Sequence, residues 1–219
     1  MATRHVLEEL SREFERRSAA HVVIESVGGV DAAKRVQAGE AFDVVILASQ
    51  AIDQLLAAGK VVPGSKVDVA RSGVAVAVRA GAPKPDLSTE AALRRAVAAA
   101  RSLGYSTGPS GAHLAGLFER WGIAAQVAGR TVQASPGVPV GTLVARGDVE
   151  LGFQQLSELI HLPGIEVAGP LPPEVQIETV FSGAVCAAAS QPEAGRELLD
   201  FLGSPQTAEI KRRHGMEGA

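Results

Sequence analysis

The sequence predicts a two-lobed α/β fold in which each lobe is a mainly parallel sheet flanked by helices. Strand-like apolar runs alternate with amphipathic helical segments, an order typical of parallel sheets covered by helices on both faces. The 219 residues exceed one small domain and suit two lobes that share a chain. Hydrophobic residues make up 46% of the chain and charged residues 21%, which favours a packed core over disorder.

The first sixty residues show this alternation most clearly. Apolar side chains at helical spacing predict a helix over 4–17, and the β-branched run HVVIES predicts a strand over 21–26. A helix follows Gly28 and Gly29 and stops near Gly39. The continuous apolar run at 42–49 predicts a strand buried on both faces of a parallel sheet, and a short helix ends at Gly59. An α/β lobe normally opens with a strand, whereas this chain opens with a helix. We therefore expect that a short strand belongs ahead of the first helix and that this chain lacks it.

Two later strands mark where the chain would pass between the lobes. Residues 72–79 and 177–188 are these candidate crossings. Two crossings imply that one lobe is inserted into the other. We therefore expect one lobe from residues 1–76 and 180–219, and an inserted lobe from 77–179. Within the inserted lobe, Ser88 or Thr89 is expected to cap a long Ala-rich helix.

Three loops share one design, since each carries glycine and small hydroxyl residues or proline before opening a helix. They are SVGG at 26–29, STGPSG at 106–111 and SPGVPVG at 135–141. Helix N-termini offer backbone N–H groups to an anion, and glycine permits close approach, although ordinary capping explains any single loop. Gln154 and Gln155 add neutral donors and acceptors at a strand end. The candidate ligand-binding residues are Ser26, Gly28, Gly29, Ser106, Thr107, Ser110, Pro139, Val140, Gln154 and Gln155.

Composition argues against several function classes. Aromatic residues make up 4% of the chain and the net charge is -3, which disfavours nucleic-acid binding. The five histidines show no metal-ligand spacing, so we expect no metal and no cofactor. Cys186 is interpreted as a small apolar residue in a strand, and no apolar run is long enough to span a membrane. His113 is interpreted either as a proton carrier near a cleft between the lobes or as a surface helix residue. Glu158 is interpreted as a helix cap. No catalytic residue is identified.

The N-terminal segment MATRHVLEELSREFERR is charged and amphipathic. It lacks the apolar run and the small-residue cleavage site of a secretory signal. A periplasmic location is expected if a signal peptide was removed, and a cytoplasmic one if this start is native.

The motifs resemble those of a known family. GGVDAAKRVQAGEAFDVVILAS, YSTGPSG and VPVGTLVARGDVELGFQQLSEL are similar in order and spacing to segments of molybdate-binding proteins of the ABC transporter class. The resemblance covers nearly the whole chain. It implies a type II periplasmic-binding-protein fold, a small oxyanion held between the lobes, and a transporter permease as partner. Gln154 and Gln155 stand where typical molybdate binders carry an aromatic hydroxyl.

The last third also resembles bacterial aconitate isomerase, an enzyme of the same fold. The resemblance is carried by PVGTLVARGDVELGFQQLSEL and by GIEVAGPLPPEVQ after it. It implies a tricarboxylate ligand and a 1,3-proton shift, which needs a general base and fixed donors for the carboxylates. Solute capture for transport is the first expectation, the isomerase is the alternative, and a cytosolic anion sensor is a further one.

Overall fold

The computed structural model describes residues 2–135 and 137–219 of the chain. It divides into two compact units: unit 1 comprises Met1–Arg71 with Thr179–Ala219, and unit 2 comprises Ser72–Glu178. Both ends of the chain therefore belong to unit 1, and unit 2 is an insertion. Strands β2 (Val67–Arg79) and β7 (Glu178–Val185) carry the chain from one unit to the other and back.

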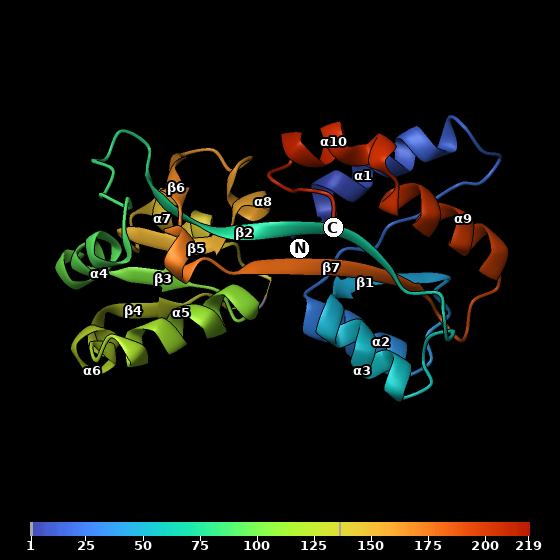
Figure 1. Ribbon diagram of the computed structural model, residues 1–219, viewed down its shortest axis with the longest axis horizontal. Coiled ribbons are helices and arrows are strands. Elements are labelled where there is room, and N and C mark those ends of the chain that lie inside the picture. The colour runs from blue at the N-terminus through green and yellow to red at the C-terminus, as the bar shows by residue number, and fades with distance from the viewer. Residues whose placement is uncertain (1, 136) are drawn as a thin grey trace. The chain divides into compact units, whose positions relative to one another are not determined.

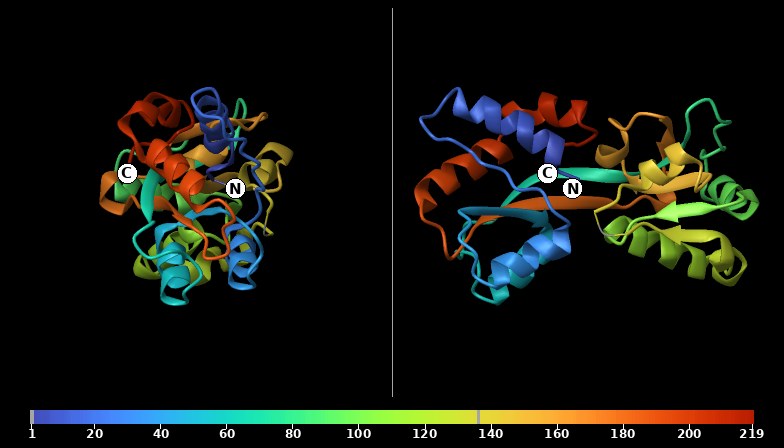
Figure 2. Two further views of the ribbon diagram at one scale, coloured as in Figure 1. Left: turned by 90° about the vertical axis from the view of Figure 1, so that its right-hand side faces the viewer. Right: turned by 180° about the vertical axis from the view of Figure 1, so that it is seen from behind.

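Unit 1 surrounds the antiparallel pair β1 and β7, in which Val44 lies opposite Val185. Helices α2 and α3 lie together on one side of β1, whereas α1 and α10 lie together on the other side of the unit (Figures 1 and 2). The remaining elements of unit 1 are α1 (Arg4–Glu15), α2 (Gly29–Gln37), β1 (Val44–Ala48), α3 (Ser49–Ala57), α9 (Pro192–Gly203), the 3₁₀-helix Pro205–Thr207 and α10 (Ala208–Arg213).

Unit 2 is a sheet in the order β2-β5-β3-β4, with β6 pairing β2 as well. Its strands are the second part of β2, β3 (Leu103–Tyr105), β4 (Thr131–Gln133), β5 (Leu151–Gln155) and β6 (Ile165–Pro170). Its helices are α4 (Glu90–Ala99), α5 (Pro109–Arg120), α6 (Ala124–Val127), α7 (Val140–Arg146), α8 (Leu156–Leu159) and the 3₁₀-helices Ala128–Arg130 and Pro173–Val175. Thr89 caps α4 as expected, since its Oγ1 accepts from the Ala92 N–H at 3.1 Å.

The two faces of the unit 2 sheet are covered by different helices because side chains alternate along a strand. Val74, Val76 and Val78 of β2 face the core formed with α4 and α5. Ala75 and Ala77 face the opposite side, where α8 packs. Unit 1 has two smaller cores, one between α1 and the closing helices and one beneath α2 and α3.

Three expectations about strands need correction. Residues 21–26 form no strand: Val22 donates its N–H to the Glu15 carboxylate at 2.7 Å, and the Val23 side chain is 79% exposed. Strand β1 pairs antiparallel with β7, and its burial alternates instead of covering both faces. The mainly parallel sheet is found only for β3, β4 and β5, because the crossing strand β2 runs antiparallel to β5 and β6.

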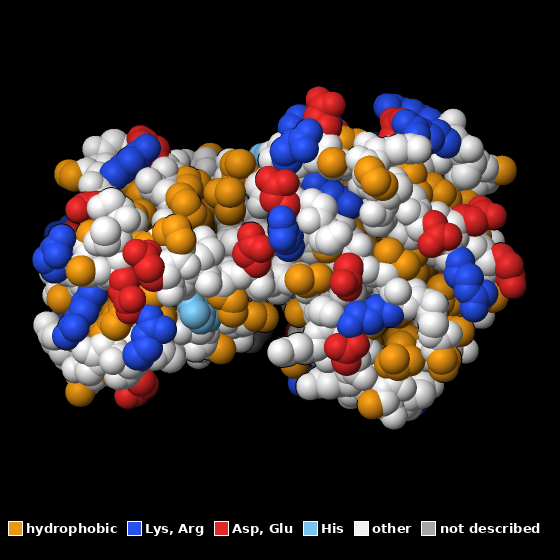
Figure 3. Space-filling model, viewed as in Figure 1, with side chains coloured by type: hydrophobic (Ala, Val, Ile, Leu, Met, Phe, Trp, Pro, Cys, Tyr) orange, Lys and Arg blue, Asp and Glu red, His pale blue; other side chains and the backbone are white. Residues whose placement is uncertain are grey.

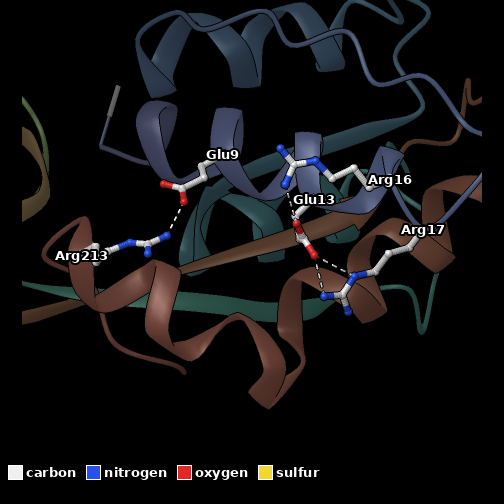
Figure 4. A network of polar contacts seen from close by, with 5 residues as sticks. All are labelled: Glu9, Glu13, Arg16, Arg17 and Arg213. Carbon is white, nitrogen blue, oxygen red and sulfur yellow. Dashed lines mark hydrogen bonds and ion pairs between the residues drawn. The ribbon is translucent and has the colours of Figure 1, made fainter.

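Ion pairs lie along α1 at the surface of unit 1 (Figure 4). Arg213 of α10 pairs with Glu9 of α1, so the two ends of the chain are joined. Glu13 accepts from Arg17 Nε at 2.9 Å and from Arg16 Nη1 at 3.1 Å. Exposed pairs of this kind contribute about 0–1 kcal/mol each, so packing of the apolar face of α1 is the larger source of stability.

Candidate functional site

A cluster of neutral polar side chains lies at the N-terminus of α5 in unit 2. Ser106 Oγ and Ser110 Oγ are 3.0 Å apart, and Ser110 Oγ donates to Gln155 Oε1 at 3.2 Å. Ser110 is 1% exposed and Gln155 is 3% exposed. The sequence places these groups near one another because β3 ends just before Ser106 and β5 ends at Gln155, and β3 and β5 are parallel neighbours. Their ends therefore lie at one edge of the sheet.

Close packing of α5 on the β3 loop sets the geometry of this cluster. A Cβ atom added at Gly111 would stand 1.7 Å from the Ser106 carbonyl oxygen. Only glycine allows that approach, and the approach brings the Ser110 hydroxyl to the Ser106 hydroxyl. Ser106 Oγ also accepts from the Gly108 N–H at 3.3 Å, which holds the loop in its turn. The cluster presents hydroxyl and amide groups beside the positive end of a twelve-residue helix.

A second polar chain links β5 to the two helices that pack beside it. Gln154 Oε1 accepts from the Val140 N–H, the first of α7, at 2.8 Å. Gln154 Nε2 donates to Glu158 Oε2 at 2.5 Å. Gln154 is 2% exposed, whereas Glu158 is partly exposed. Burial raises the pKa of Glu158 above its usual 4.5.

The predicted residues therefore fall into two groups. In unit 2, hydrogen bonds bring together Ser106, Ser110 and Gln155. A separate hydrogen bond joins Val140 to Gln154. Thr107 lies in the loop that opens α5, and Pro139 lies in the loop that opens α7. Ser26, Gly28 and Gly29 belong to unit 1, where Gly28 is the N-cap of α2. Their contact with a ligand stays a prediction. Pro136, part of the third predicted loop, lies outside the described residues.

Sequence reasoning assigned Glu158 to capping and missed its hydrogen bond to Gln154. The signal was present in the spacing, since Gln154 and Glu158 are four residues apart across the start of α8. His113, which the sequence suggested as a possible proton carrier, is bonded through Nε2 to the Val175 carbonyl at 2.8 Å. In the described part of the chain, no three His, Cys, Asp or Glu residues gather as a possible metal site.

The surface bears no large patch of one charge on the face seen in Figure 3. Lys and Arg side chains alternate there with Asp and Glu side chains. No helix among the described residues is both long and apolar enough to cross a bilayer. Any attraction for an anionic ligand is therefore expected to come from local donors such as the α5 cluster.

Two α/β units joined by two crossing strands, with polar loops at strand ends, define the class of type II periplasmic binding proteins. Solved structures share this fold. The periplasmic molybdate-binding protein of Azotobacter vinelandii superposes with a TM-score of 0.77 at 21% identity, covering 98% of this chain and 95% of that one. Peb3 from Campylobacter jejuni gives a TM-score of 0.74 at 11% identity, covering 100% and 96%.

The chain belongs to the bacterial extracellular solute-binding proteins, whose family model matches residues 1–217. A curated relative, the aconitate isomerase of a Pseudomonas species, is 40% identical over 184 residues. That match covers 84% of this chain and 70% of the relative. The expected fold class and both expected resemblances are thus confirmed.

Proposed function

We propose that this protein binds a small tricarboxylate and interconverts the isomers of aconitate by a 1,3-proton shift. The observation that carries the proposal is the 40% identity to an aconitate isomerase along most of the chain. The molybdate-binding neighbour is only 21% identical, and likeness at that level supports a shared fold alone. The preference therefore moves from oxyanion capture, our first expectation, to the isomerase.

The polar cluster of unit 2 suits a carboxylate ligand. A carboxylate oxygen accepts hydrogen bonds, and hydroxyl and primary amide groups donate them. Ser106, Ser110 and Gln155 supply such groups without a competing carboxylate among them. Gln155 also stands where the molybdate-binding resemblance calls for an aromatic hydroxyl, so a tetrahedral oxyanion would meet a different donor.

The first test is a thermal-shift panel of cis-aconitate, trans-aconitate, citrate, molybdate, tungstate and sulfate. A ligand present at 100 times its Kd stabilises the folded protein by about 2.7 kcal/mol. We expect the aconitates to raise the melting temperature, and proton NMR to show conversion of trans-aconitate to cis-aconitate. A shift with molybdate and tungstate alone, with no conversion, would instead support a solute-capture role with a transporter permease.

The second test is Gln155→Ala, with Gln126→Ala as the matched control. Gln126 is exposed on α6 of the same unit. Loss of a buried hydrogen-bonding group costs about 1–3 kcal/mol, and 1.4 kcal/mol is tenfold in affinity. We expect Gln155→Ala to weaken aconitate binding at least tenfold by calorimetry, with the control unchanged. Equal affinities for the two variants would place the ligand elsewhere.

A further inference from the structure

The isomerisation needs a group that accepts a proton from carbon, and the neutral donors of the α5 cluster cannot do so. We propose that Glu158 is this proton acceptor and that Gln154 holds its carboxylate in position. The inference rests on the proposed function and adds a catalytic residue to it.

The geometry that supports this role is the fixed position of one carboxylate oxygen. Gln154 Nε2 donates to Glu158 Oε2 at 2.5 Å, and Gln154 Oε1 accepts from the Val140 N–H at 2.8 Å. Both ends of the Gln154 amide are therefore occupied, so its orientation is set. In this proposal Oε2 is held by Gln154, and Oε1 is the oxygen that takes up the proton.

The electrostatic environment keeps Glu158 basic. Arginine hydrogen bonds lower the pKa of Glu8 and Glu13 on the surface, whereas burial raises the pKa of Glu158. A carboxylate of raised pKa is a better proton acceptor.

The elements packed against α8 add little charge. Strand β5 carries no charged residue, and Arg146 is exposed at the far end of α7. Glu166 of β6 is paired with Lys84 at 3.1 Å. In the described part of the chain, no Lys, Arg or His forms an ion pair with Glu158. Among the influences on the pKa of Glu158, burial is the largest, and the smaller ones, including the Gln154 hydrogen bond, lower it.

The proton balance of the step is closed. The Glu158 carboxylate removes a proton from the methylene carbon, and the C–H electron pair forms the new C=C bond. The former double-bond pair moves to the former vinylic carbon, which takes a proton from the Glu158 carboxyl after that carboxyl has exchanged with solvent. The carboxylate is regenerated, and no oxidant, reductant or further reactant is needed.

The experiment compares Glu158→Gln with Glu119→Gln, an exposed glutamate on α5 of the same unit. Glutamine keeps an oxygen that can accept from Gln154 but cannot take up a proton. We expect the Kd for cis-aconitate to stay within about threefold, and kcat to fall by about 10²–10⁴-fold. Wild-type protein in D₂O should incorporate deuterium into aconitate, and Glu158→Gln should not. The control variant should match wild type in all three measurements.

A pH profile supplies a readout that a structural role would not move. Wild-type kcat should fall as pH decreases through the pKa of Glu158, which lies above 4.5. If Glu158→Gln fails to fold, this profile and that of Glu158→Asp decide the question. A wild-type protein that binds aconitate without isomerising it overturns the proposed function and this role together. A wild-type protein that isomerises aconitate while Glu158→Gln keeps its kcat, or loses binding instead, overturns this role alone.

Discussion

Replacing Gly111 with alanine tests the packing on which the Ser106–Ser110–Gln155 cluster depends. The new Cβ atom would lie 1.7 Å from the Ser106 carbonyl oxygen and 2.8 Å from Tyr105 Cδ2. Ordinary contact begins at 3.4 Å, twice the first of these distances. Because the obstructing atom belongs to the backbone, the start of α5 must move away from the β3 loop. A movement of that size takes the 3.2 Å bond between Ser110 and Gln155 beyond hydrogen-bonding range.

The expected cost is at the upper end of that for overpacking, about 3 kcal/mol. For a chain of this size, each kcal/mol lowers the melting temperature by about 2–4 °C, so we expect a loss of roughly 6–12 °C. Urea unfolding followed by circular dichroism measures the free energy, and the aconitate thermal shift measures the site. Both should decrease in Gly111→Ala.

The control lies in the same helix. A Cβ atom at Gly116 meets nothing within 4 Å, so Gly116→Ala should stabilise the protein by about 0.5–1 kcal/mol through helix propensity. Aconitate binding by this control should be unchanged. If Gly111→Ala is as stable as wild type and binds aconitate normally, the close approach of α5 to Ser106 does not set the site.

Two further predictions concern unit 1. Asp43 Oδ1 accepts from the Ser190 and Gln191 N–H groups before α9, and the Gln191 bond is the main cause of a lowered Asp43 pKa. Asp43→Ala should lower the free energy of unfolding at pH 7, measured in urea, by about 1 kcal/mol. Because the pKa of Asp43 is depressed in the folded state, the difference from wild type should disappear as the pH falls through that pKa. Burial, with a smaller effect of Asp43, raises the pKa of Cys186 to about 11. The Cys186 thiol of the folded protein should therefore not react with Ellman's reagent at pH 8, and it should react only after urea unfolding. Rapid labelling of the folded protein would contradict this prediction.

Sequence patterns predicted the elements whose signals are local. Helix α1 follows from apolar spacing, and α4 follows from the cap at Thr89, which the structure confirms. Pairing directions depend on residues far apart in the chain, and they were the main error. The run at 21–26 has strand-forming side chains, yet a strand also needs a neighbour, and the Glu15 carboxylate takes the Val22 N–H instead. The short strands β4 and β6 carried too weak a pattern to be noticed.

The candidate site was predictable to a similar depth. Loop-to-helix motifs located Ser106 and Ser110, and the strand end located Gln155. The proximity of these residues follows from parallel neighbours β3 and β5. The part proposed for Glu158 was not predictable, because its raised pKa comes from burial in the folded chain.

The insertion of unit 2 between two parts of unit 1 has a consequence for biosynthesis. A ribosome releases the chain from its N-terminus, so unit 2 is complete once Glu178 has emerged. Unit 1 must wait longer, since β1 finds its partner only when Ser182 to Val185 are made, and α1 finds α10 later still. During that interval the first seventy residues expose apolar faces on α1 and β1. Chaperones can therefore bind these apolar faces on the nascent chain, until the last forty residues are made and cover them.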